Sequence, residues 1–205
     1  MREPEPFLRP VAIDALRPTQ ITVGLREVAR KRRDWRARAE QDGSEFLGRH
    51  MIPAVKGPKD RYWIIDAHHL ARALHDEGVA YVLVREIADL SALPPRAFRT
   101  FMDSRGWLHP YDKAGQRQDS RHLPKHVRGL VDDPWRSLAG ELRRAGGFAK
   151  DPTPYAEFLW ADFLRRHVPG KLLASDFDKA LARAVDLAQK KKAAYLPGWA
   201  GIDDG

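Results

Sequence analysis

The sequence predicts an α+β protein in which a small mixed α/β domain precedes a mostly helical half, and three observations predict it. Strand-like apolar segments occur only in about the first 90 residues. A strand, a helix and another strand follow one another at positions 62–84. After the prolines at 94 and 95, helical periodicity replaces the strand pattern. We therefore expect one domain over residues 1–92 and a helical domain over residues 93–205 packed on it.

The central unit begins with Tyr62–Ile65, which we interpret as a buried strand because aromatic and β-branched side chains suit a pleated sheet. Asp66 then stands where a helix N-cap belongs, and its carboxylate could accept hydrogen bonds from the amides of His68 or His69. Apolar side chains recur every three or four residues up to a glycine, and Val79–Val84 predicts the second strand. If these two strands pair in parallel, their connection should be right-handed.

The residues before this unit predict an extended segment, a helix and a strand. Val11–Leu16 favours the extended segment, and Thr22 is a candidate cap for a helix over about Val23–Glu40. The polar and glycine residues at 42–44 favour the end of that helix. Ile52–Lys56 predicts a strand that forms a hairpin with the next strand across a Gly-Pro turn.

The second half predicts helices from their start signals. A capping side chain followed by proline is typical of a helix N-terminus. The predicted helices are Pro95–Ser104, one opened by Asp133 and Pro134, Tyr155–His167 preceded by Thr153 and Pro154, and one from Ser175 to about Ala194.

Composition restricts the classes of protein that fit. The 205 residues contain no cysteine, which excludes a disulfide scaffold, a thiolate zinc site and a cysteine nucleophile. No apolar run reaches the roughly 18 residues of a membrane span, and the first residues lack the apolar core of a signal peptide. We therefore expect a soluble, cytoplasmic protein without a membrane partner.

The formal net charge is +8, and a basic run at positions 26–38 concentrates much of it. One interpretation is a solvated helix face, and the other is a surface that attracts a nucleotide or nucleic acid. Glu27 is interpreted as the helical partner of Lys31, four residues further on. The basic residues are Arg26, Arg30, Lys31, Arg32, Arg33, Arg36 and Arg38.

The start of the helix after Asp66 is a candidate anion site, because helix N-termini present N–H groups and a partial positive charge. Adjacent helical side chains point about 100° apart, so His68 and His69 do not suit one metal ion, and no metal site is predicted. Arg72 and His75 share the face of His68 and favour an anion. The alternative is that one histidine caps or packs and the other is merely polar.

Other candidate chemistry is limited. Glu157 and Asp162 lie in an otherwise apolar helix, so each is interpreted as a salt-bridge partner or, alternatively, as a general base. The sequence contains no Walker-type glycine loop, paired-glycine dinucleotide motif or serine elbow. We interpret four of the six tryptophans as core or lid residues, namely Trp107, Trp135, Trp160 and Trp199.

The run Ile64–Leu70, preceded by Leu16–Gln20, resembles the hinge motif of the ParB/sulfiredoxin superfamily, and the match is best with its ParB-like nuclease group. The resemblance covers about residues 8–90. It implies a small mixed-sheet α/β domain in which the start of the hinge helix holds nucleotide phosphates.

The sequence also departs from the superfamily pattern. His68 stands at the position of the sulfiredoxin cysteine, so sulfiredoxin chemistry is excluded. Leu70 replaces the hinge arginine, so Arg72 would have to reach the phosphates instead. Ala67 replaces a glycine, which is a mild change if the backbone there is already helical. Gln20 stands where free serine kinases of the superfamily have a glutamate base, which weakens a kinase mechanism.

We therefore expect a nucleotide- or phosphate-binding protein whose ligand, ATP, ADP or CTP with Mg²⁺, lies on the amides of Ala67–His69. If it is an enzyme, phosphoryl transfer or nucleotide hydrolysis is the expected reaction. The alternative is a ParB-like DNA-binding protein or nuclease that uses the basic surface at 26–38, and a third is a protein-interaction domain that retains the histidine pair as a remnant. The candidate catalytic residues are Asp66, His68 and His69, with Glu157 and Gln20 as further candidates, and the candidate binding residues are Ala67, His68, His69, Arg72, Lys31, Arg32 and Arg33.

Overall fold

The computed structural model describes residues 8–201, except for the side chains of residues 8 and 40–47. The chain divides into two compact units, which are described separately. The first comprises the residues up to Val23 together with Val28–Val131, and the second comprises Gly24–Glu27 together with the residues from Asp132 onward. No helix in the described part of the chain combines the length and apolarity that a membrane span requires.

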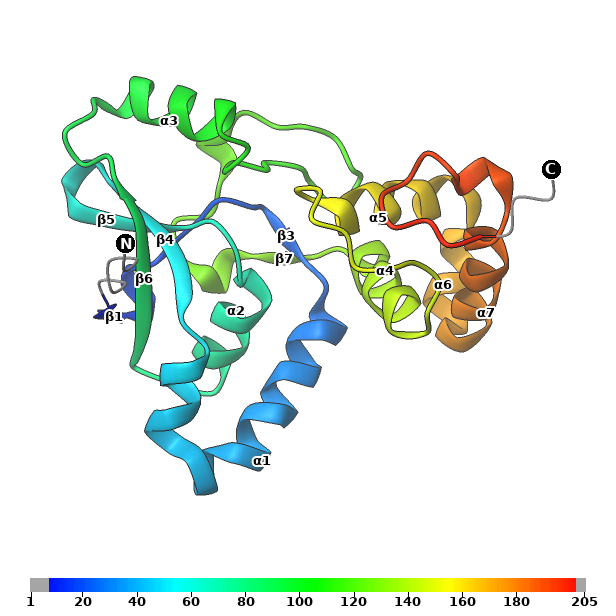
Figure 1. Ribbon diagram of the computed structural model, residues 1–205, viewed down its shortest axis with the longest axis horizontal. Helices are drawn as coiled ribbons and strands as arrows, with labels where there is room; N and C mark the ends of the chain where they lie inside the picture. The colour runs from blue at the N-terminus through cyan, green and yellow to red at the C-terminus, as the bar shows by residue number, and fades with distance from the viewer. Residues whose placement is uncertain (1–7, 202–205) are drawn as a thin grey trace, which may run out of the picture. The chain divides into compact units, whose positions relative to one another are not determined.

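The first unit is built on a mixed five-stranded sheet with the order β1-β6-β4-β5-β2, which confirms the predicted α+β class (Figure 1). The strands β4 and β5 are antiparallel and form the predicted hairpin. The strand β6 pairs in parallel with β4 and antiparallel with β1, and β2 pairs in parallel with β5. The strand bounds are β1 Leu8–Ala12, β2 Arg17–Pro18, β4 Ile52–Gly57, β5 Arg61–Ile64 and β6 Tyr81–Asp89. A separate two-stranded sheet joins β3 (Thr22–Val23) to β7 (Val131–Asp132).

The two strands that flank the central helix are not neighbours. The strand β4 lies between β5 and β6, so these two strands do not pair, and the condition set for a right-handed connection is not met. Because β4 is antiparallel to β5 and parallel to β6, β5 and β6 run in opposite directions. The short turn after β4 makes β4 the local partner of β5, and β6 then adds to the other side of β4.

Three helices belong wholly or mainly to the first unit: α1 (Leu25–Arg49), α2 (His68–Asp76) and α3 (Pro95–Ser104), the last with the predicted bounds. The helix α1 continues beyond residues 42–44, so its predicted end is wrong. A glycine within a helix costs about 1 kcal/mol, which a long helix can tolerate. Thr22 lies in β3 and does not cap α1, so that prediction is also wrong.

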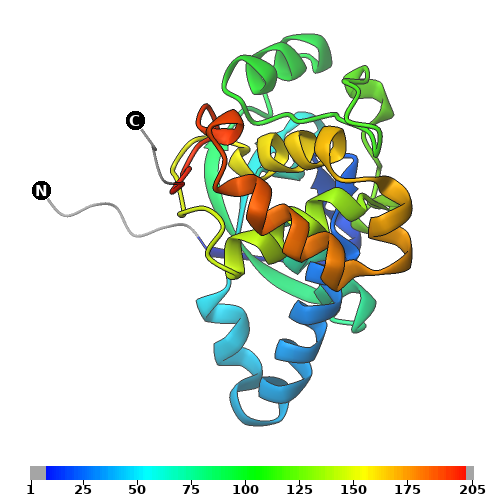
Figure 2. The same cartoon turned by 90° about the vertical axis from the view of Figure 1, so that its right-hand side faces the viewer.

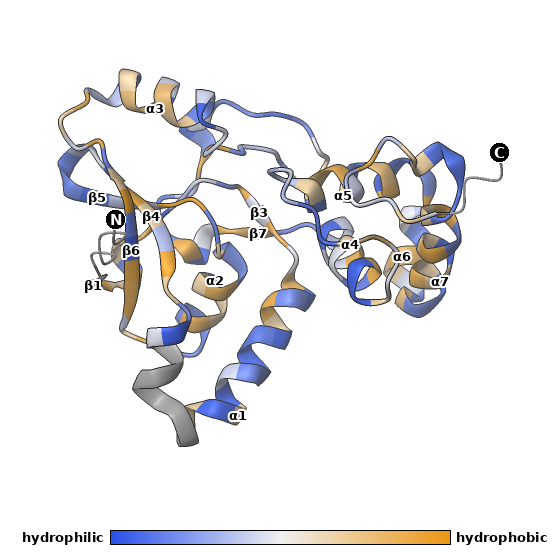
Figure 3. Cartoon of the chain, viewed as in Figure 1, coloured by the Kyte–Doolittle hydropathy of each residue, from blue (hydrophilic) through white to orange (hydrophobic). Residues whose placement is uncertain are grey.

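The helices α2 and α3 cover opposite faces of the sheet. In β4, Ile52 and Ala54 join the buried cluster that contains residues of α2, whereas Val55 joins the cluster formed with Phe98 of α3. Gly57 also belongs to this second face, since a Cβ there would lie 2.6 Å from the Phe98 ring. Hydrophobic residues are concentrated in the strands and α2, while α1 is largely hydrophilic (Figure 3).

The predicted boundary at 92/93 differs from the division observed after Val131. The segment that follows β6 contributes Met102, Leu108 and Leu123 to the cluster of α3, and Val127 to the cluster of α2. Because these side chains complete the core of the sheet, residues 93–131 belong to the first unit.

The second unit is a helical bundle around one hydrophobic cluster in which Trp160 and Phe163 are fully buried (Figure 2). Asp133 caps α4 as predicted, since its carboxylate accepts a hydrogen bond from the Trp135 amide at 3.0 Å. The helix bounds are α4 Pro134–Arg144, α5 Ala156–His167, α6 Gly170–Ser175 and α7 Phe177–Ala188.

Two predicted helix starts in this unit are wrong. The N-cap residue of α5 is Tyr155, in a left-handed conformation, and not Thr153. The helix α7 is capped by Asp176, which accepts from the Lys179 amide at 3.0 Å, whereas Ser175 ends α6. Both starts lie close to the predicted positions, but another residue provides the cap.

Candidate functional site

His68, the first residue of α2, is fixed in the interior with 2% of its surface exposed. The Thr19 amide donates a hydrogen bond to His68 Nε2 at 3.1 Å, and the Thr19 hydroxyl donates to the carbonyl oxygen of Ile64 at 2.8 Å. Because Nε2 accepts, the ring proton of the neutral imidazole lies on Nδ1. Thr19, which follows β2, therefore joins the end of β5 to His68 at the start of α2. His68 matches the alternative of a packed histidine, and its Nε2 is not available to a ligand.

Ala67 precedes α2 in a left-handed conformation, with φ +61° and ψ +26°. The backbone here is not helical, so the condition under which the change from glycine is mild is not met, and alanine stands here at a cost of about 1–2 kcal/mol. Asp66 is exposed, and its Oδ1 accepts from the Ala67 amide at 2.6 Å. Its predicted role as the cap for the amides of His68 or His69 is thus wrong.

The backbone changes from a left-handed to a right-handed conformation at the start of α2. A left-handed residue next to a right-handed one turns successive N–H groups toward a common point, and such concavities bind anions. The methyl group of Ala67 cannot cap the helix, and the first turn of α2 has no acidic residue. The helix α5 begins with the same conformation at Tyr155, but has Glu157 in its first turn. His69 is partly exposed in the first turn of α2, next to these amides.

Arg72 is directed to the other end of α2. Its Nε donates to Asp76 Oδ1 at 2.9 Å, and its Nη1 donates to the carbonyl oxygens of Leu130 at 2.6 Å and Arg128 at 3.2 Å. Its guanidinium therefore holds the segment before β7, and the arrangement does not support the role on a ligand phosphate that the resemblance implied.

Arg32 and Arg36 also lie at the far end of α2, since both donate to the carboxylate of Glu77. The nine residues of α2 span about 13 Å, which separates Arg32 from the start of the helix. The hydrogen bond from Arg36, assisted by the one from Arg32, holds the pKa of Glu77 at about 2. Part of the basic run of α1 therefore serves to attach α1 to α2. Lys31 and Arg33 lie on the same helix.

Two further candidates, Gln20 and Glu157, take part in interactions that support the fold. Gln20 is buried, and its backbone forms a bridge with His109. Glu157 belongs to the second unit and pairs with Arg143 at 3.1 Å, which confirms the salt-bridge interpretation.

Residues 105–113 were not among the candidates, yet they contain partly exposed aromatic rings, and their backbone is bonded to Thr19. The His109 amide donates to the Thr19 carbonyl oxygen at 2.8 Å. The rings of His109 and Tyr111 stack with their centres 4.2 Å apart. Trp107 packs against the buried cluster that contains Phe98, as a core residue would, but it is only partly buried. The signal that could have identified the segment is the alternation of cationic and aromatic residues at every second position.

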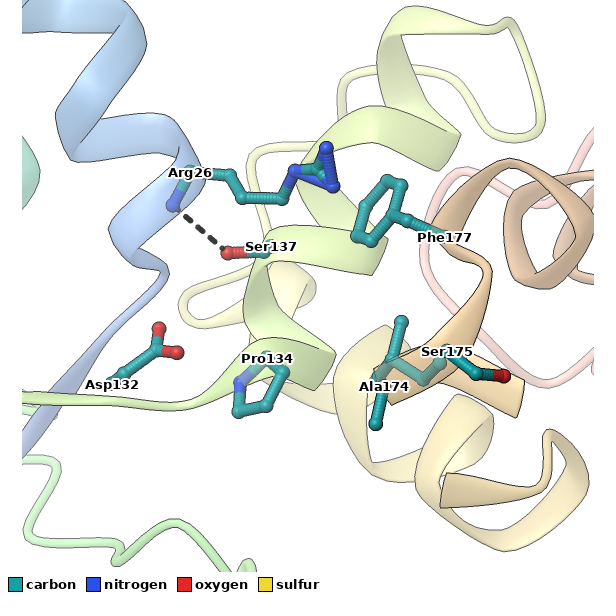
Figure 4. Close-up of a pocket in the computed structure, with 8 residues that line it drawn as sticks. Arg26, Asp132, Pro134, Ser137, Ala174, Ser175 and Phe177 are labelled. Carbon is teal, nitrogen blue, oxygen red and sulfur yellow. Dashed lines mark hydrogen bonds between the residues drawn. The ribbon is translucent and has the colours of Figure 1, made fainter. Parts of the chain in front are cut away.

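A pocket of about 380 Å³ lies in the second unit (Figure 4). The Leu25 amide at the start of α1 donates to Asp132 Oδ1 at 2.8 Å, and the Arg26 amide donates to Ser137 Oγ at 3.3 Å. The Arg26 guanidinium lies 3.7 Å from the centre of the Phe177 ring. Of the predicted residues, only Arg26 of the basic run lines this pocket. The full lining is Arg26, Asp132, Pro134, Ser137, Leu173, Ala174, Ser175 and Phe177.

The described part of the chain contains no group of three or more histidine and carboxylate side chains placed to hold one metal ion. A metal at the start of α2 would therefore depend on Asp66 together with oxygen atoms of a ligand or of water.

Comparisons with known proteins were made for the whole chain. A family model described as "Putative ParB-like nuclease" matches residues 9–166, which confirms the resemblance noted in the sequence and extends it into α5. No curated protein matches the chain. Among solved structures, the crystal structure of protein Atu1540 from Agrobacterium tumefaciens is similar, with 49% sequence identity and a TM-score of 0.90. That match covers 97% of this chain and 100% of the other.

Proposed function

This chain belongs to the ParB-like nuclease family, and from that premise we propose that the start of α2 binds a phosphate group of a nucleotide. The observation that carries the proposal is the change from left-handed to right-handed backbone at Ala67 and His68. It directs the amide groups of the first turn, which has no acidic side chain, toward one point, while the Ala67 amide before them donates to Asp66 Oδ1.

The neighbouring side chains suggest how the ligand is held. The imidazole of His69 is partly exposed next to the amides and can donate to a phosphate oxygen. The carboxylate of Asp66 would repel a bare phosphate, whereas a Mg²⁺ ion shared between carboxylate and phosphate oxygens would remove that repulsion. We therefore propose ATP, ADP or CTP together with Mg²⁺ as the ligand.

If the bound nucleotide reacts, phosphoryl transfer or hydrolysis is the reaction that this site suits. Such reactions depend mainly on positioning and on stabilisation of charge. In this proposal Asp66 and His69 contact the ligand, and His68 is a positioning residue that acts through Thr19.

Isothermal titration with ATP, ADP and CTP, each with and without Mg²⁺, tests the proposal. His69→Ala should weaken binding about tenfold, because it removes a hydrogen bond to a charged group. Asp66→Asn should reduce the dependence on Mg²⁺. The matched control is His122→Ala, which removes an exposed histidine from a separate turn. Absence of binding at millimolar nucleotide, or equal binding by the two histidine variants, would contradict the proposal.

The family description favours nucleic-acid cleavage as a second candidate. In that case the phosphate at α2 belongs to a nucleic acid, and the exposed cations of α1 add a salt-dependent attraction. Supercoiled plasmid and single-stranded DNA incubated with Mg²⁺ or Mn²⁺ test it. Cleavage that Asp66→Asn abolishes would support a nuclease, and intact DNA under all these conditions would exclude it.

A further inference from the structure

The segment that follows α3 carries a stripe of cationic and aromatic side chains, here called the 105–113 stripe. Its members occupy every second position, and of the intervening residues Leu108 and Pro110 are buried, whereas Gly106 and Asp112 are partly exposed. The three ring-bearing members are all partly exposed. The alternation therefore separates an anchored side of the segment from a side that offers rings and positive charge. The members of the 105–113 stripe are Arg105, Trp107, His109, Tyr111 and Lys113.

The rings of the 105–113 stripe are already arranged for stacking. The Arg105 guanidinium lies 5.2 Å from the centre of the Trp107 ring, and the Phe101 ring is 6.2 Å from Trp107. The planes of His109 and Tyr111 differ by 22°, which is a stacked arrangement. Rings held in this way lose little conformational freedom when a further flat group is added.

Thr19 connects the 105–113 stripe to the start of α2. Its carbonyl oxygen accepts from the His109 amide at 2.8 Å, and its amide donates to His68 Nε2 at 3.1 Å. Both features belong to the first unit. One residue thus separates a stacking surface from the amides proposed to hold a phosphate.

We propose that the 105–113 stripe is a stacking surface for single-stranded nucleic acid. Bases stack on Trp107 and Tyr111, and a backbone phosphate of the same strand lies at the start of α2. The placement of this phosphate rests on the proposed function, whereas the stacking surface does not. Alternating rings and cations suit a single strand, because its base faces are exposed and each stacked base contributes about 1–3 kcal/mol. In a duplex the neighbouring base pairs cover those faces.

Binding of fluorescein-labelled dT12 by fluorescence anisotropy tests the inference. Trp107→Ala and Tyr111→Ala should each weaken binding roughly tenfold, whereas Tyr111→Phe, which keeps the ring, should bind like the unmodified protein. The matched control is Tyr81→Ala, because Tyr81 is 62% exposed on β6. Circular dichroism identifies variants that fail to fold, and in that case Trp107→Phe, expected to retain most of the affinity, replaces Trp107→Ala.

The outcomes separate the two proposals. Loss of dT12 binding in Tyr111→Ala but not in His69→Ala would support the stacking surface and contradict the placement of the strand's phosphate at the start of α2, while the nucleotide titration tests the phosphate site itself. Nucleotide binding that depends on His69, with equal dT12 affinity in Tyr111→Ala and Tyr81→Ala, would overturn the inference and leave the proposed function standing. Absence of dT12 binding at low salt, or preference for a duplex of the same length, would also overturn it.

Discussion

The two adjacent histidines at the start of α2 have different roles, because helical geometry points neighbouring side chains about 100° apart. His68 is directed inward, where its Nε2 accepts from the Thr19 amide. His69 is partly exposed. The sequence identifies the pair as special, but the direction of each ring depends on which side of α2 covers the sheet.

Replacement of His68 should destabilise the fold far more than replacement of His69. His68→Ala leaves a buried cavity and an unpaired Thr19 amide, which together should lower the free energy of unfolding by about 2–4 kcal/mol. His69→Ala should change it by less than about 0.5 kcal/mol. Urea denaturation followed by circular dichroism measures both values, and equal losses would contradict the assignment of roles.

Ala67 offers a substitution that should stabilise the protein. Glycine adopts the left-handed conformation without the Cβ clash, so Ala67→Gly should raise the free energy of unfolding by about 0.5–1 kcal/mol after the entropy of glycine in the unfolded chain is subtracted. Ala73→Gly, in the right-handed part of the same helix, should instead lower it by about 1 kcal/mol. Thermal denaturation of the two variants provides the comparison, and a lower melting temperature for Ala67→Gly would show that the alanine is not strained.

At the scale of elements, the attachment of α1 to α2 depends on one carboxylate. Arg36 and Arg32 lower the pKa of Glu77 from its ordinary value of 4.5 to about 2. A carboxyl with a lowered pKa stabilises the folded state above its unfolded pKa, and this contribution is lost as the pH falls from about 4.5 toward 2. The tie between the helices should therefore weaken in acid.

Glu77→Gln tests this tie. The variant should lose about 1 kcal/mol or less at pH 7, since the arginines remain accessible to solvent. Its melting temperature should also fall less steeply than that of the unmodified protein between pH 4.5 and pH 2, because one titrating group is missing. Glu141→Gln provides a carboxylate control in the second unit. Parallel pH profiles for Glu77→Gln and the unmodified protein would contradict the expected titration.

The elements that could be predicted are those whose ends are set by side chains next to them in the sequence. Asp133 followed by Pro134 fixed the start of α4, and the Gly-Pro turn after β4 produced the hairpin. The starts at Ala67 and Tyr155 could not be predicted in the same way, because there a left-handed backbone introduces the helix without a capping side chain. Tertiary packing selects such a conformation, and residue type does not indicate it.

At the scale of the whole molecule, the limits of the first unit depend on packing that no local pattern reveals. Helical periodicity marked residues from Pro95 onward as different in type, but the contacts of Phe98 and Met102 with the sheet decide that they belong to the first unit. Long-range packing also decides which part of the candidate site could be predicted. Asp66 and the histidine pair form a contiguous motif, whereas the position of His109 follows from its pairing with Gln20, far away in the sequence.

The hydrogen bonds from Arg72 to the carbonyl oxygens of Arg128 and Leu130 have a consequence for digestion by trypsin. Arg128 is exposed, so it offers trypsin a cleavage site, yet the carbonyl group of the bond to be cut is held by another side chain. A protease must extend that bond into its own cleft, so cleavage after Arg128 should be slow in the native protein and at least several-fold faster in Arg72→Met. Mass spectrometry of timed digests measures the two rates, with cleavage after the exposed Arg121 as the internal reference. Unchanged rates would show that Arg72 does not protect this bond. Faster cleavage in Arg72→Met would show that Arg72 holds the backbone shortly before Asp132 in place, and a cut at this bond divides the chain into two fragments.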